Sequence, residues 1–151
     1  MSTGATLPIL REMRDRDKYV FISHSSKDTT VISAVKQAFK DLAIKPYFAE
    51  EETAGVPPSK EIAEAVLKAD ALFVFFTTNT LFGETRDWIV FEIGVAVAHG
   101  KRIYCWIAGG LGKESLPRLL EQVTKYREFN AWTSDGAIKL TGEIRDVARD
   151  L

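Results

Sequence analysis

The fold of this chain is decided by Tyr19-Val20-Phe21-Ile22-Ser23-His24-Ser25-Ser26-Lys27-Asp28. The segment opens with an apolar run, as in a short buried strand, and the polar residues that follow favour a turn. Beyond the turn, apolar residues recur at spacings of four, four and three, which predicts a helix with one buried face (Val31, Val35, Phe39 and Leu42). Asp28 or Thr29 is expected to cap its first turn. The segment therefore predicts a strand that leads directly into an amphipathic helix.

The same order of strand and then helix recurs along the rest of the chain. Further strands are predicted at residues 46–49, 71–76, 103–107 and 126–132, and further helices at 59–69, 87–99, 116–122 and from Thr133 or Ser134 to 151. The strand at 71–76 is apolar without alternation, as expected of a strand covered on both faces. We therefore predict an α/β, flavodoxin-like three-layer sandwich, a five-stranded parallel sheet with helices on both faces.

The size and composition of the chain are typical of one globular domain. It has 151 residues, of which 46% are hydrophobic and 27% are charged. Residues 1–17 are rich in charged side chains and are interpreted as a tail or a short helix. Residues 18–151 are interpreted as the domain.

Charge and cysteine content restrict the partners and the compartment. The net charge of −1 gives no electrostatic footprint for nucleic acid or for an anionic membrane. No apolar run reaches the roughly 20 residues that span a bilayer. Cys105 is the only cysteine, so an internal disulfide is excluded and a reducing compartment is indicated. We expect a cytoplasmic protein without nucleic-acid or membrane partners.

Ligands of parallel sheets bind outside the carboxyl ends of the strands, where the strand order reverses. The loops expected at that edge are residues 23–28, 50–58 and 79–87. The second of these begins with three glutamates and continues through Gly55 to two prolines. It is longer than typical connections between strand and helix, and long loops in compact domains are often functional.

Glu92 is the most unusual residue of the sequence. It is the only ionisable residue among residues 88–98, a helical segment that is apolar nearly all round and is therefore expected to be buried. Desolvating an ionised carboxylate costs several kcal/mol unless it is paired or opens onto a polar cavity. Trp88 lies one helical turn earlier on the same face. A carboxylate beside an aromatic wall suits a sugar or nucleotide pocket, although a Glu paired with an arginine or capping a neighbouring backbone fits the sequence as well.

The loop of residues 23–28 offers backbone N–H groups and small hydroxyls at the start of a helix, which can receive phosphate or ribose. Ordinary turn and cap chemistry explains the same residues. The chain contains no GxGxxG after its first strand, no Walker loop and no GxSxG elbow. Its two distant histidines and single cysteine give no metal-ligand spacing, so no metal site is predicted.

Three separated segments resemble motifs of the TIR (Toll/interleukin-receptor) domain of the bacterial and archaeal, NAD-cleaving type. Residues 19–28 are similar to its first box. Residues 52–62, with Gly55, resemble its BB loop and the start of the next helix. The segment Trp88-Ile89-Val90-Phe91-Glu92-Ile93-Gly94-Val95-Ala96, with Gly100-Lys101 after it, resembles its third helix, with Trp88 and Glu92 in the family's relative positions. The resemblance covers residues 18–151 in order.

The resemblance implies that the chain cleaves the nicotinamide–ribose bond of NAD+, by hydrolysis or by cyclisation to a cyclic ADP-ribose isomer, in prokaryotic immune or stress signalling. NAD+ would be the substrate, and no cofactor is implied. Glu92 would be the catalytic carboxylate. The nucleotide pocket would be lined by Ser23, His24, Ser25, Ser26, Asp28, Phe48, Gly55, Arg86 and Trp88. The resemblance further implies self-association and a downstream effector protein that senses the product.

The sequence departs from the family pattern at two places. Arg86 stands six residues before Glu92, where the family often has a serine, and can either pair with Glu92 or hold a phosphate. The loop at 50–58 begins with three glutamates, unlike the loop of animal signalling TIR domains.

Two other functions fit the sequence. One is a non-catalytic interaction module that assembles through the BB loop, in which Glu92 is structural. The other is an enzyme similar to nucleoside deoxyribosyltransferases, which would exchange bases on deoxynucleosides and ignore NAD+.

Overall fold

The computed structural model describes residues 18–49, 59–120 and 126–151. Its described strands form one parallel five-stranded sheet with the order β2-β1-β3-β4-β5. The strands are β1 (Tyr19–Ser23), β2 (Lys45–Tyr47), β3 (Ala71–Phe76), β4 (Ile103–Ala108) and β5 (Tyr126–Phe129). The predicted flavodoxin-like α/β fold is confirmed.

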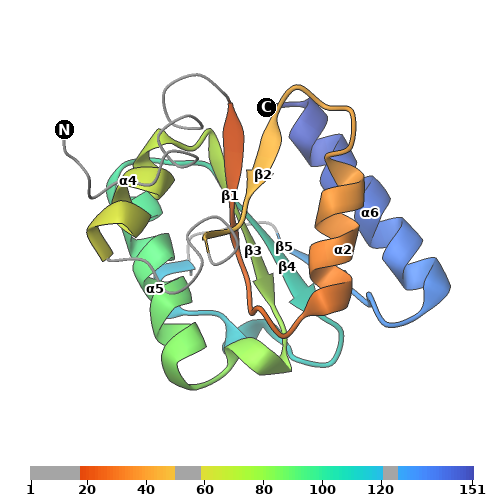
Figure 1. The fold of residues 1–151 in the computed structure, drawn as a ribbon. Helices are drawn as coiled ribbons and strands as arrows, with labels where there is room; N and C mark the ends of the chain where they lie inside the picture. Colours follow the sequence, from red (N-terminus) through yellow and green to blue (C-terminus); the bar gives the residue numbers. More distant parts are fainter. Residues whose placement is uncertain (1–17, 50–58, 121–125) are drawn as a thin grey trace.

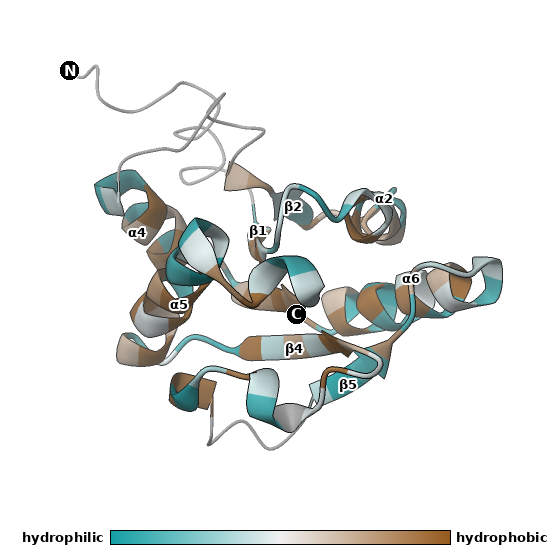
Figure 2. Cartoon of the chain, turned by 90° about the horizontal axis from the view of Figure 1, so that it is seen from below, coloured by the Kyte–Doolittle hydropathy of each residue, from teal (hydrophilic) through white to brown (hydrophobic). Residues whose placement is uncertain are grey.

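Helices cover both faces of the sheet, as Figure 1 shows. The α-helices in the described ranges are α2 (Thr29–Ala38), α4 (Ser59–Lys68), α5 (Gly83–Ala98) and α6 (Ser134–Arg149). Helices α4 and α5 lie on one face, and α2 and α6 lie together on the other. Figure 2 shows brown, hydrophobic segments on each of these helices. None of the described helices is long and apolar enough to cross a membrane.

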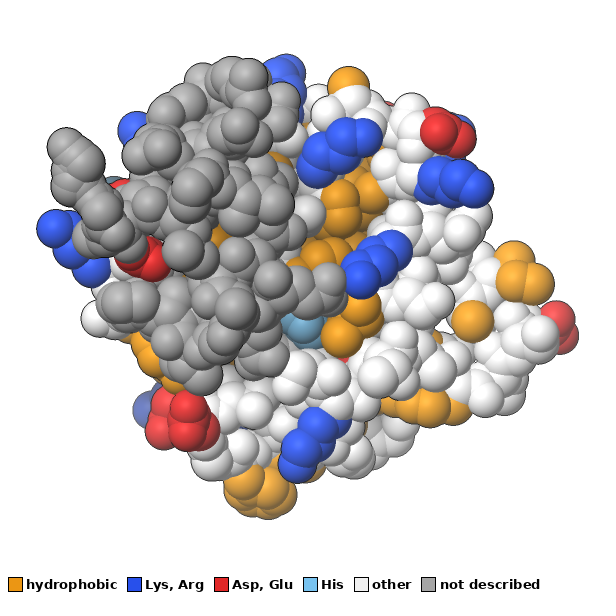
Figure 3. All heavy atoms as spheres, in the orientation of Figure 1, with side chains coloured by type: hydrophobic (Ala, Val, Ile, Leu, Met, Phe, Trp, Pro, Cys, Tyr) orange, Lys and Arg blue, Asp and Glu red, His pale blue; other side chains and the backbone are white. Residues whose placement is uncertain are grey.

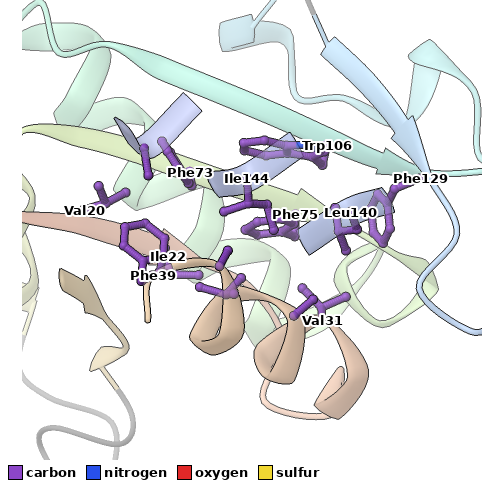
Figure 4. Close-up of a cluster of buried hydrophobic side chains, with 14 of the residues drawn as sticks. Val20, Ile22, Val31, Phe39, Phe73, Phe75, Trp106, Phe129, Leu140 and Ile144 are labelled. Atoms are coloured by element: carbon purple, nitrogen blue, oxygen red, sulfur yellow. The ribbon is translucent and has the colours of Figure 1, made fainter. Parts of the chain in front are cut away.

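Alternation along β1 divides its side chains between two hydrophobic cores. Val20 and Ile22 belong to the core under α2 and α6, which Figure 4 shows together with the rings of Phe75 and Trp106. Tyr19 and Phe21 belong to the core under α4 and α5. The same rule places the next odd residue, Ser23, on the α5 side of the sheet.

Several predicted boundaries differ from the structure. Helix α5 begins at Gly83, whereas the prediction placed its start at residue 87. The first turn is polar and gives no apolar periodicity, so the sequence pattern did not reveal it. The prediction of a helix at 116–122 is wrong in its described part, where two short 3-10 turns (η2, Lys113–Ser115, and η3, Arg118–Leu120) flank Pro117. Proline has no N–H to donate to a helical ladder. Residues 121 and 122 lie outside the described residues.

Helix α5 is also less enclosed than its composition predicts. Its inner residues Ile89 and Ile93 are buried, whereas Phe91 is 37% exposed and Val97 is 45% exposed. The helix therefore covers the sheet with one side and leaves apolar side chains on the other. It ends at Ala98 with His99 as its C-cap, and Gly100 follows with a φ of +66°, as expected of the residue after a helix C-cap.

The two predicted helix caps behave differently. Thr133 caps α6, because its hydroxyl accepts a hydrogen bond from the Gly136 N–H at 3.1 Å. Asp28 occupies the N-cap position of α2, but its side chain makes no capping hydrogen bond. The prediction that Asp28 or Thr29 caps this turn is wrong, since the Asp28 carboxylate is bound to another loop.

A carboxylate at the switch point of the sheet

The candidate site lies where the strand order reverses. Strand β1 pairs with β2 on one side and with β3 on the other. From β1 the chain continues to β2 on one side, whereas from β3 it continues to β4 on the opposite side. At the carboxyl ends of these strands, β1 leads through residues 24–28 into α2, and β3 leads through a short 3-10 helix, η1 (Thr78–Thr80), toward α5. Open parallel sheets bind their ligands at this position.

Glu92 and Ser23 meet at this edge. The Ser23 hydroxyl donates a hydrogen bond to Glu92 Oε1, and the two residues are 1% and 7% exposed respectively. Ser23 points to α5 because it follows Tyr19 and Phe21 on one face of β1. A hydrogen bond to a charged acceptor is among the stronger ones in proteins. The contact brings together the predicted catalytic carboxylate and a predicted pocket residue that lie 69 positions apart in the chain.

Trp88 lies one turn before Glu92 on α5. Its partly buried indole packs against the core under α4 and α5. It also meets the ring of Phe91 edge-on, with centroids 5.8 Å apart and an interplanar angle of 90°. The aromatic group predicted beside Glu92 is therefore held on one side by the core and on another by its own helix.

Asp28 joins the two loops of the site. Its Oδ2 accepts a hydrogen bond from Thr77 Oγ1 at 2.6 Å, and its Oδ1 accepts one from Asn79 Nδ2 at 2.8 Å. Asp28 is 3% exposed and Thr77 is 1% exposed. The carboxylate predicted to line the nucleotide pocket thus has a protein donor on each of its oxygens.

His24 and Phe48 come together on the other side of the sheet. Their rings meet edge-on with centroids 5.3 Å apart, and Phe48 belongs to the core under α2 and α6. Lys36 of α2 lies with its ammonium group 5.6 Å from the Phe48 centroid. The structure therefore separates these two predicted pocket residues from Ser23 and Glu92, because the side chains at the end of β1 alternate between the faces.

The remaining predicted pocket residues occupy different surroundings. Arg86 donates from Nη1 to the Ser115 carbonyl oxygen at 3.0 Å, so its guanidinium group is directed to the segment after β4. Ser25 is buried and accepts a hydrogen bond from the Lys27 N–H at 3.2 Å, whereas Ser26 is exposed. Gly55 lies outside the described residues.

Other reactive groups are remote from this edge or unreactive. Burial raises the pKa of the Cys105 thiol to about 12, so it stays protonated at neutral pH. Within the described ranges, no three His, Cys, Asp or Glu side chains gather to hold a metal ion.

A groove of about 470 Å³ runs between α2 and α6, where Ser33 and Thr141 are among its lining residues. On the face seen in Figure 3, lysine and arginine side chains lie apart from one another among hydrophobic and acidic ones.

Sequence reasoning did not single out Thr77 and Asn79 as partners of Asp28. A signal was present, since Thr77 directly follows the apolar strand β3, and the carboxyl ends of neighbouring parallel strands meet at one edge. The choice of partner depended on distances between loops about 50 residues apart. Spacing along the chain carries no such information.

The fold and this edge define an α/β domain with a buried carboxylate at its switch point. A family model described as the TIR domain matches residues 20–140, and the chain belongs to this family, in its bacterial type. No curated protein sequence matches the chain at a significant level.

Among solved structures, the chain is similar to the CMP N-glycosidase BcmB of Clostridium botulinum. The TM-score is 0.57 and the sequence identity is 18%, and the match covers 89% of this chain and 100% of that chain. At this identity the likeness concerns the fold.

Proposed function

We propose that this protein is an N-glycosidase that cleaves the nicotinamide–ribose bond of NAD+, with Glu92 as its catalytic carboxylate. The observation that carries the proposal is the burial of Glu92, hydrogen-bonded by Ser23, at the point where the strand order reverses. Membership of the TIR family supports it, because many TIR domains of the bacterial and archaeal type cleave NAD+. NAD+ is the substrate in this proposal, and no separate cofactor takes part.

The chemistry needs a negative charge close to the ribose. When the bond between ribose C1′ and the nicotinamide nitrogen breaks, its electron pair stays on nicotinamide, which leaves as a neutral molecule. The positive charge moves to C1′ and the ribose ring oxygen as an oxocarbenium ion. A buried carboxylate stabilises that ion, as carboxylates do in glycoside hydrolysis. Water then adds at C1′ and releases a proton to give ADP-ribose, or a nitrogen of the adenine adds to give a cyclic isomer.

Two neighbours of Glu92 are suited to assist. The Ser23 hydroxyl fixes one carboxylate oxygen and so orients the group. The indole of Trp88, one turn away, offers a flat apolar wall for the nicotinamide or ribose. From the rest of the predicted pocket lining, we expect Ser25, Ser26, Arg86 and Gly55 to contact the same substrate, together with His24, which follows β1, and Phe48, which follows β2.

The decisive experiment measures nicotinamide release from NAD+ by chromatography and product mass, with the wild-type chain beside Glu92→Gln. The variant keeps the size of the side chain but removes its charge, so release should fall by about 100-fold or more. Glu84→Gln is the matched control, because Glu84 is an exposed carboxylate at the start of the same helix. It should retain wild-type turnover. Undiminished release by a folded Glu92→Gln variant would remove Glu92 from the mechanism.

CMP is the second substrate to test, because the solved protein with the similar fold is a CMP N-glycosidase by its name. Release of cytosine without release of nicotinamide would keep the glycosidic chemistry and replace the substrate. Base exchange on deoxynucleosides alone would identify the transferase alternative. A folded protein that acts on none of these substrates would favour the remaining alternative, the non-catalytic interaction module.

The setting of the reaction is part of the proposal. We infer a cytoplasmic protein of a prokaryotic immune or stress-signalling system, whose domains associate with one another through the loop at 50–58. A downstream effector would sense the product. The single cysteine supports a reducing compartment, since it leaves no partner for an internal disulfide.

A further inference from the structure

Asp28 occupies a position from which an aspartate side chain usually caps the helix that follows it. It precedes Thr29, the first residue of α2, and aspartate is among the preferred N-cap residues. Nevertheless its side chain makes no capping hydrogen bond. The backbone of the turn is closed without it, since the Asp28 N–H donates to the Ser25 carbonyl at 3.0 Å. The Asp28 carboxylate therefore does not cap α2.

The Asp28 carboxylate instead joins two loops. Thr77 and Asn79 each donate to one oxygen of Asp28, at 2.6 and 2.8 Å. Thr77 is itself held in place, because its hydroxyl accepts from the Asn79 N–H at 3.1 Å and its N–H donates to Thr80 Oγ1 at 3.0 Å. Both donors of the bridge are thus fixed by the short helix η1 that follows β3.

The bridge and the Ser23–Glu92 contact connect the same two segments of the chain. The first segment runs from Ser23 through Asp28, and the second runs from Thr77 along η1 and α5 to Glu92. One hydrogen bond joins them at Ser23 and Glu92, and two join them at Asp28. A displacement of one segment against the other is opposed at both ends, so Asp28 restrains the position of Ser23 relative to Glu92.

We propose that Asp28 is a positioning residue for the catalytic carboxylate, acting through Thr77 and Asn79 rather than through the substrate. The inference rests on the proposed function, since it concerns the turnover of the Glu92 site. It predicts that the hydrogen-bond pattern matters and that the negative charge at position 28 does not. A residue that contacts the substrate through its charge would show the reverse.

Three variants separate the two roles. Asn79→Asp sets two carboxylates against each other and breaks the bridge, so kcat for base release should fall by about 10- to 100-fold with KM changed by less than about threefold. Asp28→Asn keeps both bonds once the exposed Asn79 amide turns over, so kcat should stay within about threefold of wild type. The double variant Asp28→Asn with Asn79→Asp again pairs an amide with a carboxylate and should restore kcat.

Thr78→Asp is the matched control for Asn79→Asp, because it adds the same charge at an exposed neighbour in η1 and should leave kcat unchanged. The melting temperature of every variant shows which chains are folded. Should Asn79→Asp not fold, Thr77→Val takes its place with the same expected loss of kcat. It keeps the side-chain shape and removes the hydroxyl that donates to Asp28 and accepts from the Asn79 N–H.

The outcomes keep the two claims apart. A wild-type chain that releases no base refutes the proposed function, and this inference with it. An active wild type with undiminished kcat in folded Asn79→Asp overturns the inference alone. Loss of kcat in Asp28→Asn that the second substitution does not restore also overturns it, and assigns the charge of Asp28 to the substrate.

Discussion

Glu92 is 7% exposed, so its carboxylate has lost most of its hydration. A hydrogen bond from the Ser23 hydroxyl of β1 replaces part of that hydration. Both partners come from rigid elements, β1 and α5, rather than from loops. Side chains held by regular elements keep a productive geometry more closely than side chains on loops. At the residue scale, the site is therefore a pair of side chains whose distance is set by the packing of a helix on a sheet.

The Ser23–Glu92 contact gives a prediction at this scale. Ser23→Ala removes the hydroxyl that donates to Glu92 Oε1. The loss of a hydrogen bond to a charged group costs about 1.5–3 kcal/mol, so base release should fall by about 10- to 100-fold. Ser33→Ala, at an exposed position of helix α2, is the control and should be neutral. Equal rates for the two variants would show that the hydroxyl of Ser23 has no part in turnover.

At the scale of elements, the end of β1 decides which loop residues meet. Ser23 continues the face of Tyr19 and Phe21 and reaches α5, while His24 contacts the ring of Phe48, a member of the core under α2 and α6. Two adjacent residues of one motif thus serve opposite sides of the sheet. A strand with a residue inserted before Ser23 would turn the hydroxyl away from Glu92.

Helix α6 offers a test of how tightly the elements are joined. A Cβ at Gly136 would lie 1.7 Å from the Asn130 carbonyl oxygen, whereas a Cβ at Gly142 has no neighbour within 4 Å. Gly136→Ala should therefore lower the free energy of unfolding by about 2 kcal/mol or more. In the same helix Gly142→Ala should raise it by about 0.5–1 kcal/mol, because alanine loses less entropy on folding. Urea unfolding of both variants measures the difference, and equal stabilities would contradict the close approach at Gly136.

At the scale of the whole molecule, the parallel sheet brings three distant parts of the chain to one edge: residues 23–28, the turn at 77–80 and helix α5. Helices α4 and α5 cover one face of the sheet and α2 and α6 the other (Figure 1). The carboxyl edge is the place where open parallel sheets bind their ligands. The TIR resemblance adds that neighbouring domains often complete the active site between them.

Association should therefore appear in the kinetics. If a second copy completes the site, specific activity will rise with protein concentration over the range in which sedimentation or sizing shows larger species. Deleting residues 55–58 should abolish both the larger species and the rise. Activity that is proportional to concentration throughout, from a chain that stays monomeric, would show that one domain suffices.

The sequence by itself determined the architecture. The apolar runs of β1, β3 and β4 and the periodic faces of α2 and α6 predict one parallel sheet with helices on both sides, because continuous apolar runs and the helical period of 3.6 are local properties of the chain. It also picked out Glu92, since an isolated charge in an apolar helix is visible without coordinates. The short turns around Pro117 and the polar first turn of α5 escaped prediction, because they carry little or no apolar periodicity.

Only the tertiary structure decided which side chains meet. That Ser23 rather than Arg86 is bonded to Glu92, that Arg86 instead binds the Ser115 carbonyl, and that Asp28 bridges to Thr77 and Asn79 all depend on distances between segments far apart in the chain. Hydrogen bonds act over about 3 Å, and the packing of α5 on the sheet sets separations of that size. No pattern along the sequence contains them.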